Sequence, residues 1–324
     1  MSASFEPALA AAHAAAAMQD HPQATLYMVG TPIGNLADIS LRALHVLTLS
    51  DTIACEDTRH SQSLLRAYGI DKAAHQWLAV HQHNEAQASD QVLALLRQGQ
   101  RVAYVSDAGT PGISDPGARL AHAVAAQGLR VMPIPGASSV TALLSACGST
   151  KAQDAGFVFW GFLPAKGAER TSALQALAAE PRAQVLLESP HRISALASDL
   201  SVLGLRPVTV GRELTKQFEE IATLAAEQLP AWLAHSPQRL RGEFTLVVHH
   251  APQHADEMAQ ARRVLALLLE QVPVTSWTYQ QKAEWVPVQI CDVYTTRKFR
   301  QLVHALSFQS LAGTVVPYTF TQYW

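Results

Sequence analysis

The sequence has few cysteines, few charged residues and no long apolar run. Its cysteines, Cys55, Cys147 and Cys291, are odd in number and far apart. They predict neither a disulfide framework nor a cysteine metal site. No apolar run reaches the roughly 18 residues of a membrane helix. The Ala-rich stretch at 7–18 follows no Lys or Arg, which argues against a signal peptide. We therefore expect a cytoplasmic protein without a membrane partner.

The chain also lacks an excess of basic residues. It has 24 Lys and Arg against 26 Asp and Glu, which gives a formal net charge of -2. This balance argues against a strongly basic nucleic-acid binder but leaves room for a local basic patch. Hydrophobic residues make up 48% of the 324 positions. Such a chain is globular and long enough for two domains.

Short apolar segments alternate with amphipathic segments along most of the chain. Strands are expected at 25–30, 51–55 and 101–107, with helices at 86–98 and 116–127. This alternation predicts βαβ units and a parallel sheet. The Pro- and Gly-marked segment 133–139 separates a second alternating region. We predict an α/β fold with two α/β domains, 24–136 and 137–250, after a loose extension at 1–23 and before residues 251–324.

Residues 251–324 are expected to hold a helix at 253–270 and then an atypical tail. The 53 residues from 272 onwards contain ten of the chain's 22 aromatic residues and only three alanines. One interpretation is an accessory C-terminal element. The other is a tail of foreign origin, such as a shifted reading frame, which the neighbouring frames of the gene would reveal.

Two glycine-containing loops follow expected strands: "GTPIGNLADIS" at 30–40 and "SDAGTPGISDPG" at 106–117. Open α/β sheets bind ligands at the carboxyl ends of their strands. The second loop has neither the Lys-Ser/Thr pair of ATP-binding loops nor the GxGxxG pattern of dinucleotide-binding loops. It therefore predicts a small polar ligand without phosphates, with Asp107 as a hydrogen-bond acceptor. Asp115 and Pro116 are predicted to begin the next helix.

Ionisable residues gather in the stretch "ACEDTRHSQ", where Glu56, Asp57, Arg59 and His60 follow the second expected strand. They indicate either a functional site or the solvated start of a helix. A pair of histidines at 81 and 83 has no third ligand at a suitable spacing, so no metal site is expected.

Basic residues in the second half of the chain have either a functional or a structural interpretation. Arg192, Arg212 and Lys216 are suited to RNA phosphates, or they form ion pairs with neighbouring glutamates.

Eight motifs stand in order over residues 24–250: "TPIGNL", "EDTRHS", "SDAGTPGISDPG", "PGASS", "GFLPAKG", "ESPHRI", "RELTK" and "RGEFTLVV". Together they resemble the ribosomal branch of the tetrapyrrole methylase superfamily. Leu187 stands where that branch is expected to have an aromatic residue, and 221–229 lacks an expected glycine turn. The branch's helical C-terminal segment is not recognisable after about 272.

The resemblance implies 2′-O-methylation of a cytidine ribose in the decoding region of 16S rRNA within the small ribosomal subunit. It implies S-adenosylmethionine as the methyl donor, a cofactor cleft between the two domains, and a homodimer. The implied donor-binding residues are Pro32, Gly34, Asn35, Asp107, Ala108, Gly109, Thr110, Pro111, Ser138 and Ser139.

The ribosomal-branch motifs also supply candidates for catalysis and RNA contact. Glu56, Asp57 and Glu213 are the candidate catalytic residues, because a carboxylate is suited to accept the proton of a hydroxyl. The candidate RNA-binding residues are Arg59, His60, Arg192, Arg212 and Lys216. Two alternatives remain: a methyltransferase for a tetrapyrrole precursor, and a non-catalytic ribosome assembly factor with the same fold.

Overall fold

The computed structural model describes residues 5–81, 84–148 and 156–251. The helix expected at 253–270 and the tail after about 272 lie outside the described residues. Among the described helices, none combines the length and apolar character needed to cross a membrane.

The first domain is built on a five-stranded sheet in the order β3-β2-β4-β1-β5, and all of its strand pairs are parallel. Its strands are β1 (Thr25–Val29), β2 (Thr52–Cys55), β3 (Trp77–Ala79), β4 (Arg101–Val105) and β5 (Arg130–Ile134). Parallel strands place all of their carboxyl ends at one edge of the sheet, where ligands bind in folds of this kind. The predicted parallel sheet is confirmed in this domain.

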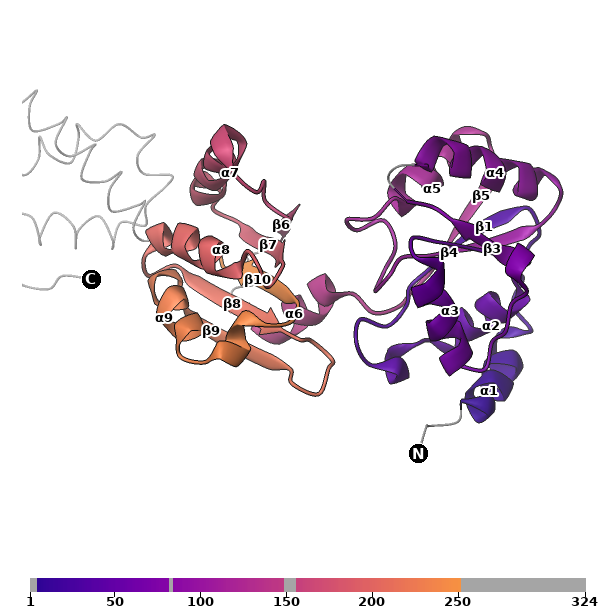
Figure 1. The fold of residues 1–324 in the computed structure, drawn as a ribbon, viewed down its shortest axis with the longest axis horizontal. Coiled ribbons are helices and arrows are strands. Elements are labelled where there is room, and N and C mark those ends of the chain that lie inside the picture. The colour runs from indigo at the N-terminus through magenta and orange to yellow at the C-terminus, as the bar shows by residue number, and fades with distance from the viewer. Residues whose placement is uncertain (1–4, 82–83, 149–155, 252–324) are drawn as a thin grey trace, which may run out of the picture. The chain divides into compact units, whose positions relative to one another are not determined.

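Helices cover both faces of the first sheet, as Figure 1 shows. α1 (Glu6–Ala16), α2 (Leu41–Leu49) and α3 (Thr58–Ala67) cover one face, and α4 (Glu85–Arg97) and α5 (Gly117–Ala126) cover the other. Successive side chains of a strand point to opposite faces. Leu26 accordingly packs in the α4–α5 core and Tyr27 in the α1–α3 core, and both are fully buried. Short 3-10 turns lie at Leu36–Asp38 and Ala74–Gln76.

The N-terminal region differs from the loose extension expected at 1–23. Residues 6–16 form helix α1, in which Ala12 and Ala16 are buried. The Phe5 ring packs edge-on against Tyr68, with 4.9 Å between ring centroids. Alanine has the highest helix propensity, and its small side chain allows close packing of helices. The Ala-rich composition of this segment therefore allows α1 to form and to pack on the domain.

The second domain has a mixed sheet in the order β6-β7-β10-β8-β9. Its strands are β6 (Phe157–Gly161), β7 (Ala183–Glu188), β8 (Pro207–Arg212), β9 (Glu220–Ala225) and β10 (Phe244–Val248). Only β6 and β7 are parallel, while the other three pairs are antiparallel. The expected all-parallel sheet is therefore wrong beyond β7. β7 and β8 still run in the same direction on either side of α8 (Ile193–Leu200), but antiparallel β10 lies between them. The sequence pattern did not predict strand β9. The short connection 213–219 joins β8 to β9, and a connection of that length suits antiparallel strands.

Helices also pack on both faces of the second sheet (Figure 1). α7 (Gly167–Ala179), α8 (Ile193–Leu200) and α9 (Leu229–Ala234) contribute to one core, and α6 (Ser139–Cys147) contributes to the other. Short 3-10 turns lie at Ser201–Leu203, Ala226–Gln228 and Pro237–Leu240. The two sheets lie on either side of the boundary expected near residues 136 and 137. The predicted α/β fold class is confirmed, with two sheets in one compact unit, Met1–Ala251.

Candidate functional site

Three loops meet at the carboxyl edge of the first sheet, after β1, β4 and β5. The Thr31 amide donates to the Gly109 carbonyl at 3.0 Å, and the Thr110 hydroxyl donates to the Ala137 carbonyl at 3.0 Å. The loop after β4 is thus hydrogen-bonded to both of the others. Three segments far apart in the sequence form one surface there.

Two of these loops touch through glycines, Gly30 and Gly136. A Cβ on Gly30 would lie 2.7 Å from the Cα of Gly136, and one on Gly136 would lie 2.6 Å from the Gly30 carbonyl oxygen. Real Cβ atoms do not approach other atoms so closely, so any side chain here would push the loops apart. The backbones pack directly because neither residue has a side chain.

The ten residues implied as donor-binding all lie on these loops or at the start of α6. Gly34, Asn35, Asp107 and Ala108 are exposed. The others are buried or half-buried: Pro32, Gly109, Thr110, Pro111, Ser138 and Ser139. The Asn35 side chain accepts from the Ala37 amide at 3.0 Å, so it also caps a short helical turn. The hydrogen bonds of Thr110 and of the Gly109 carbonyl likewise hold the loops together.

Asp115 stabilises the loop after β4 from within. Its carboxylate accepts from the amides of Gly112 at 2.7 Å, Ile113 at 3.1 Å and Gly117 at 2.7 Å. The buried Tyr104 hydroxyl donates to the same carboxylate at 3.3 Å. Asp115 was predicted to cap the following helix with Pro116 as its first residue, but α5 begins one residue later, at Gly117, with Pro116 as its N-cap. Asp115 precedes this cap and accepts from the Gly117 amide.

Glu56 lies beside Asp107 at the ends of the neighbouring strands β2 and β4. The Asp107 amide donates to Glu56 Oε1 at 3.4 Å, and the Asp57 amide donates to Asp107 Oδ1 at 3.2 Å. Burial raises the pKa of Glu56 to about 7, and the negative charges of Asp107 and Asp115 add to the effect. No ion pair involves Glu56 within the part of the chain that the structure describes.

Asp57 has a different role from its neighbour. It is the N-cap of α3 and accepts from the amides of Arg59 at 2.8 Å and His60 at 3.4 Å. These backbone hydrogen bonds hold the pKa of Asp57 below its ordinary value. The helix-start interpretation of this stretch thus holds for Asp57, whereas Glu56 is not used by the helix. The side chains of Arg59 and His60 are exposed.

Glu213 belongs to a charged cluster in the second domain. Lys216 Nζ lies 2.8 Å from Glu213 Oε1 and 3.2 Å from Glu243 Oε2, and the Glu243 amide donates to Glu213 Oε1 at 3.0 Å. Burial alone would raise the pKa of Glu213, but the hydrogen bonds from Lys216 and the Glu243 amide outweigh burial and lower it. The stem of Lys216 lies against Gly34, one of the expected donor-binding residues.

Glu243 was not among the residues singled out from the sequence. It lies thirty positions from Glu213, and the antiparallel pairing of β8 with β10 brings the two together. Its position directly before β10, in the motif "RGEFTLVV", was the only sequence signal.

Arg212 and Arg192 contact the protein's own backbone. Arg212 is only 7% exposed and donates to the carbonyls of Arg241 at 3.2 Å and Phe218 at 3.0 Å. Arg192 donates to the Leu163 carbonyl and lies 3.3 Å from the buried Glu188 carboxylate. Their guanidinium groups therefore hold loops in place, and the structure does not support the RNA contacts expected for them. Of the five RNA candidates, Arg59 and His60 are the exposed ones.

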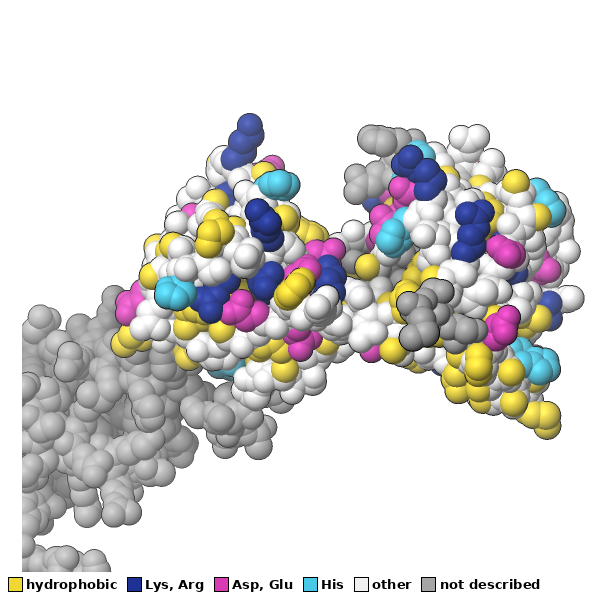
Figure 2. All heavy atoms as spheres, turned by 60° about the horizontal axis from the view of Figure 1, so that its bottom comes forward, with side chains coloured by type: hydrophobic (Ala, Val, Ile, Leu, Met, Phe, Trp, Pro, Cys, Tyr) yellow, Lys and Arg dark blue, Asp and Glu magenta, His cyan; other side chains and the backbone are white. Residues whose placement is uncertain are grey.

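The surface in Figure 2 carries basic and acidic side chains side by side. Lys and Arg are scattered among Asp and Glu on this face rather than gathered into one continuous basic area. This agrees with the net charge of -2.

Comparison with protein families gives a match over residues 25–230 to the family of tetrapyrrole (corrin/porphyrin) methylases. Similar curated proteins are named ribosomal RNA small subunit methyltransferase I. The one from Escherichia coli O157:H7 is 45% identical over 258 residues, which cover 79% of this chain and 88% of that protein. The one from Micromonospora olivasterospora is 47% identical over 236 residues, 72% of this chain and 73% of that protein.

Solved structures with the same fold are more distant in sequence. A cobalamin biosynthetic enzyme, cobalt precorrin-4 methyltransferase, matches 69% of this chain and 94% of its own with a TM-score of 0.52 at 19% identity. Diphthine synthase matches 69% of this chain and 90% of its own with a TM-score of 0.53 at 13% identity. These likenesses concern the fold alone. The family match and the curated relatives show that this chain belongs to the ribosomal RNA small subunit methyltransferase I family of the tetrapyrrole methylases.

Proposed function

We propose that this protein transfers a methyl group from S-adenosylmethionine to the ribose 2′-hydroxyl of a cytidine in the decoding region of 16S rRNA. Its substrate is the rRNA within the small ribosomal subunit, and it acts in the cytoplasm as a homodimer. The methyltransferase activity on small-subunit rRNA is supported by the names of relatives 42–47% identical to it. Transfer to a hydroxyl is supported by one observation above all, the carboxyl group of Glu56 beside Asp107 in the loop after β4.

The side chains of the loops after β1 and β4 suit S-adenosylmethionine as a ligand. Neither 30–36 nor 106–112 contains a Lys or Arg, as suits a ligand without phosphates. Asp107 is exposed and provides a carboxylate for an ammonium group or for ribose hydroxyls. The packed glycines bring backbone amides and carbonyls close to any molecule bound at this edge. S-adenosylmethionine supplies a methyl group activated by a positively charged sulfur.

Glu56 is the residue we assign to accept the proton of the 2′-hydroxyl. A hydroxyl is a poor nucleophile while protonated, and a general base is most effective when its pKa lies near the working pH. The pKa of Glu56, about 7, meets this condition. The Asp57 carboxylate accepts a hydrogen bond from the backbone of α3, and the Glu213 carboxylate forms an ion pair with Lys216. Both are therefore weaker candidates for proton transfer than Glu56.

The remaining residues of the site position the reactants. Arg59 and His60, exposed on the first turn of α3, are suited to contact RNA phosphates close to Glu56. Lys216, held by Glu213 and Glu243 against Gly34, fixes the loop after β1. Alignment of the hydroxyl oxygen with the methyl group is most of what such a reaction requires of the protein.

The proposal is tested by incubating the full chain and tritiated S-adenosylmethionine with three acceptors. These are 30S subunits that lack the modification, naked 16S rRNA, and a tetrapyrrole precursor. We expect label in the RNA of 30S subunits, and nuclease mapping with alkaline hydrolysis places the methyl group on a 2′-oxygen. Label in the tetrapyrrole would contradict the proposal, as would binding to the subunits without any transfer.

A further inference from the structure

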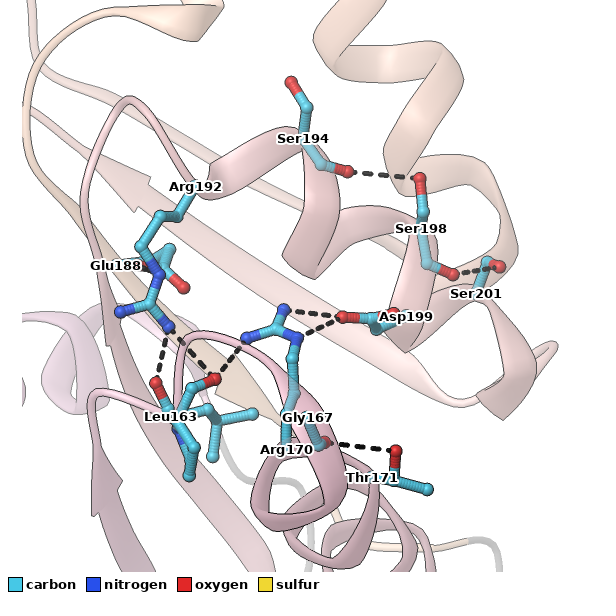
Figure 3. Close-up of polar contacts among 11 residues, drawn as sticks. Leu163, Gly167, Arg170, Thr171, Glu188, Arg192, Ser194, Ser198, Asp199 and Ser201 are labelled. Carbon is cyan, nitrogen blue, oxygen red and sulfur yellow. Dashed lines mark hydrogen bonds and ion pairs between the residues drawn. The ribbon is translucent and has the colours of Figure 1, made fainter.

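The loop that joins β6 to α7, residues 162–166, is held in place by two arginines (Figure 3). Arg170, 9% exposed, donates to the Pro164 carbonyl at 2.8 Å and to Asp199 at 2.9 Å. Arg192 donates to the Leu163 carbonyl from the other side and pairs with Glu188. Two charged groups thus fix two consecutive carbonyls of one short loop.

The loop presents an aromatic ring and a cation to solvent. Phe162 is 51% exposed, although its neighbour Leu163 is buried in the core. Lys166, at the end of the same loop, is also exposed. An exposed apolar side chain alone is common in folded proteins. Here the ring stands on a backbone that the arginines hold, so binding a partner would cost little conformational entropy.

The loop begins beside the candidate donor site. Gly161 directly precedes Phe162, and a Cβ on Gly161 would lie 3.5 Å from the Ser114 hydroxyl. Ser114 belongs to the loop after β4 that also carries Asp107, and its φ of 69° lies in the left-handed region. The residue before Phe162 is therefore in the immediate neighbourhood of the proposed donor-binding loop.

We propose that Phe162 stacks on a base of the RNA substrate next to the methylated nucleotide, and that Lys166 contacts a nearby phosphate. This inference rests on the proposed function. Proteins recognise unpaired RNA bases by stacking them on aromatic side chains, which works for any base. The chain has a net charge of -2 and the face in Figure 2 carries mixed charges, so phosphate contacts alone provide limited affinity. A stacking residue supplies affinity that does not depend on net charge.

The test compares full-length Phe162→Ala, Phe162→Trp and Phe157→Ala with the wild-type chain. Phe157 is the matched control, because it is 45% exposed and lies at the opposite end of β6. Initial rates are measured with tritiated donor at varied concentrations of unmodified 30S subunits, and thermal unfolding and sedimentation check folding and oligomeric state. We expect Phe162→Ala to raise the KM for subunits by about fivefold or more. The KM for the donor should stay unchanged.

The controls separate stacking from other roles. Phe162→Trp should restore the wild-type KM, since a larger aromatic ring also stacks, and Phe157→Ala should match the wild type. An unchanged KM for Phe162→Ala in an active enzyme would overturn this inference alone. So would loss of the dimer in Phe162→Ala, because the ring would then contact a second copy of the chain. If the wild-type chain transfers no label to 30S RNA, the proposed function fails and the inference fails with it.

Discussion

Replacing Glu56 with Gln tests the chemistry proposed for this site. Glutamine keeps the size of the side chain and an oxygen that can accept from the Asp107 amide, but it cannot take a proton from a hydroxyl. A general base contributes about a hundredfold or more to the rate. We therefore expect Glu56→Gln to lower the single-turnover rate of methyl transfer about a hundredfold and to leave the affinity for S-adenosylmethionine close to that of the wild type.

The pH dependence of the wild-type transfer rate gives a second quantitative test of Glu56 as the general base. With a pKa of about 7, the Glu56 carboxyl is roughly one-tenth ionised at pH 6 and nine-tenths ionised at pH 8. Only the ionised form accepts a proton. The wild-type rate should therefore rise about tenfold over this range. A base with an ordinary carboxylate pKa would be ionised throughout and would give a flat profile.

The raised pKa of Glu56 should also make the stability of the folded chain depend on pH. The pKa of Glu56 in the folded chain lies above its ordinary value of 4.5, so the folded state holds the proton more tightly than the unfolded state. The contribution of Glu56 to stability is therefore fully present below about pH 4.5 and is lost as the pH rises to about 7. Thermal unfolding should place Glu56→Gln above the wild type at pH 8, with the difference reduced or absent at pH 5.

The assay uses single-turnover transfer from tritiated donor to 30S subunits, with Glu213→Gln as the comparison. Glu213 is the rival carboxylate, and its pKa is lowered by Lys216 and the Glu243 amide. A wild-type rate for Glu56→Gln would refute the assignment. A flat wild-type profile between pH 6 and pH 8, with a large loss in Glu213→Gln, would transfer the role to Glu213.

Three further variants probe the donor site, the RNA contacts and the buried arginine. Asp107→Asn should weaken binding of S-adenosylmethionine about tenfold by calorimetry, because a neutral amide replaces the exposed carboxylate; wild-type affinity would exclude contact with the donor. Arg59→Ala should lower the salt dependence of 30S binding by about one unit of the logarithmic slope, and an unchanged slope would mean that this 91% exposed side chain meets no phosphate. Arg212→Met should leave that slope unaltered and lower the free energy of unfolding by about 2 kcal/mol, since its hydrogen bonds to backbone carbonyls are lost. A stable Arg212→Met variant with weakened RNA binding would restore Arg212 as an RNA contact.

The first sheet was predictable because its pattern is local. Each buried strand is short and apolar, each is followed by a turn and an amphipathic helix, and such units form parallel sheets. The second sheet was not, because the direction in which β10 pairs with β7 and β8 depends on contacts between residues far apart in the chain. The half-buried strand β9 alternates between intermediate and exposed positions, which gives a weaker signal than a fully buried strand.

The sequence motifs by themselves located the candidate site at the glycine loops and acidic residues that follow the strands. They also identified the family to which the chain belongs. They did not distinguish Glu56 from Asp57, because adjacent carboxylates have the same intrinsic chemistry. Tertiary structure separates them. The backbone of α3 binds one carboxylate, while burial beside Asp107 raises the pKa of the other. It likewise directs Arg212 inward and leaves Arg59 in solvent. Burial and partners belong to the folded chain, and they decide what an ionisable side chain can do.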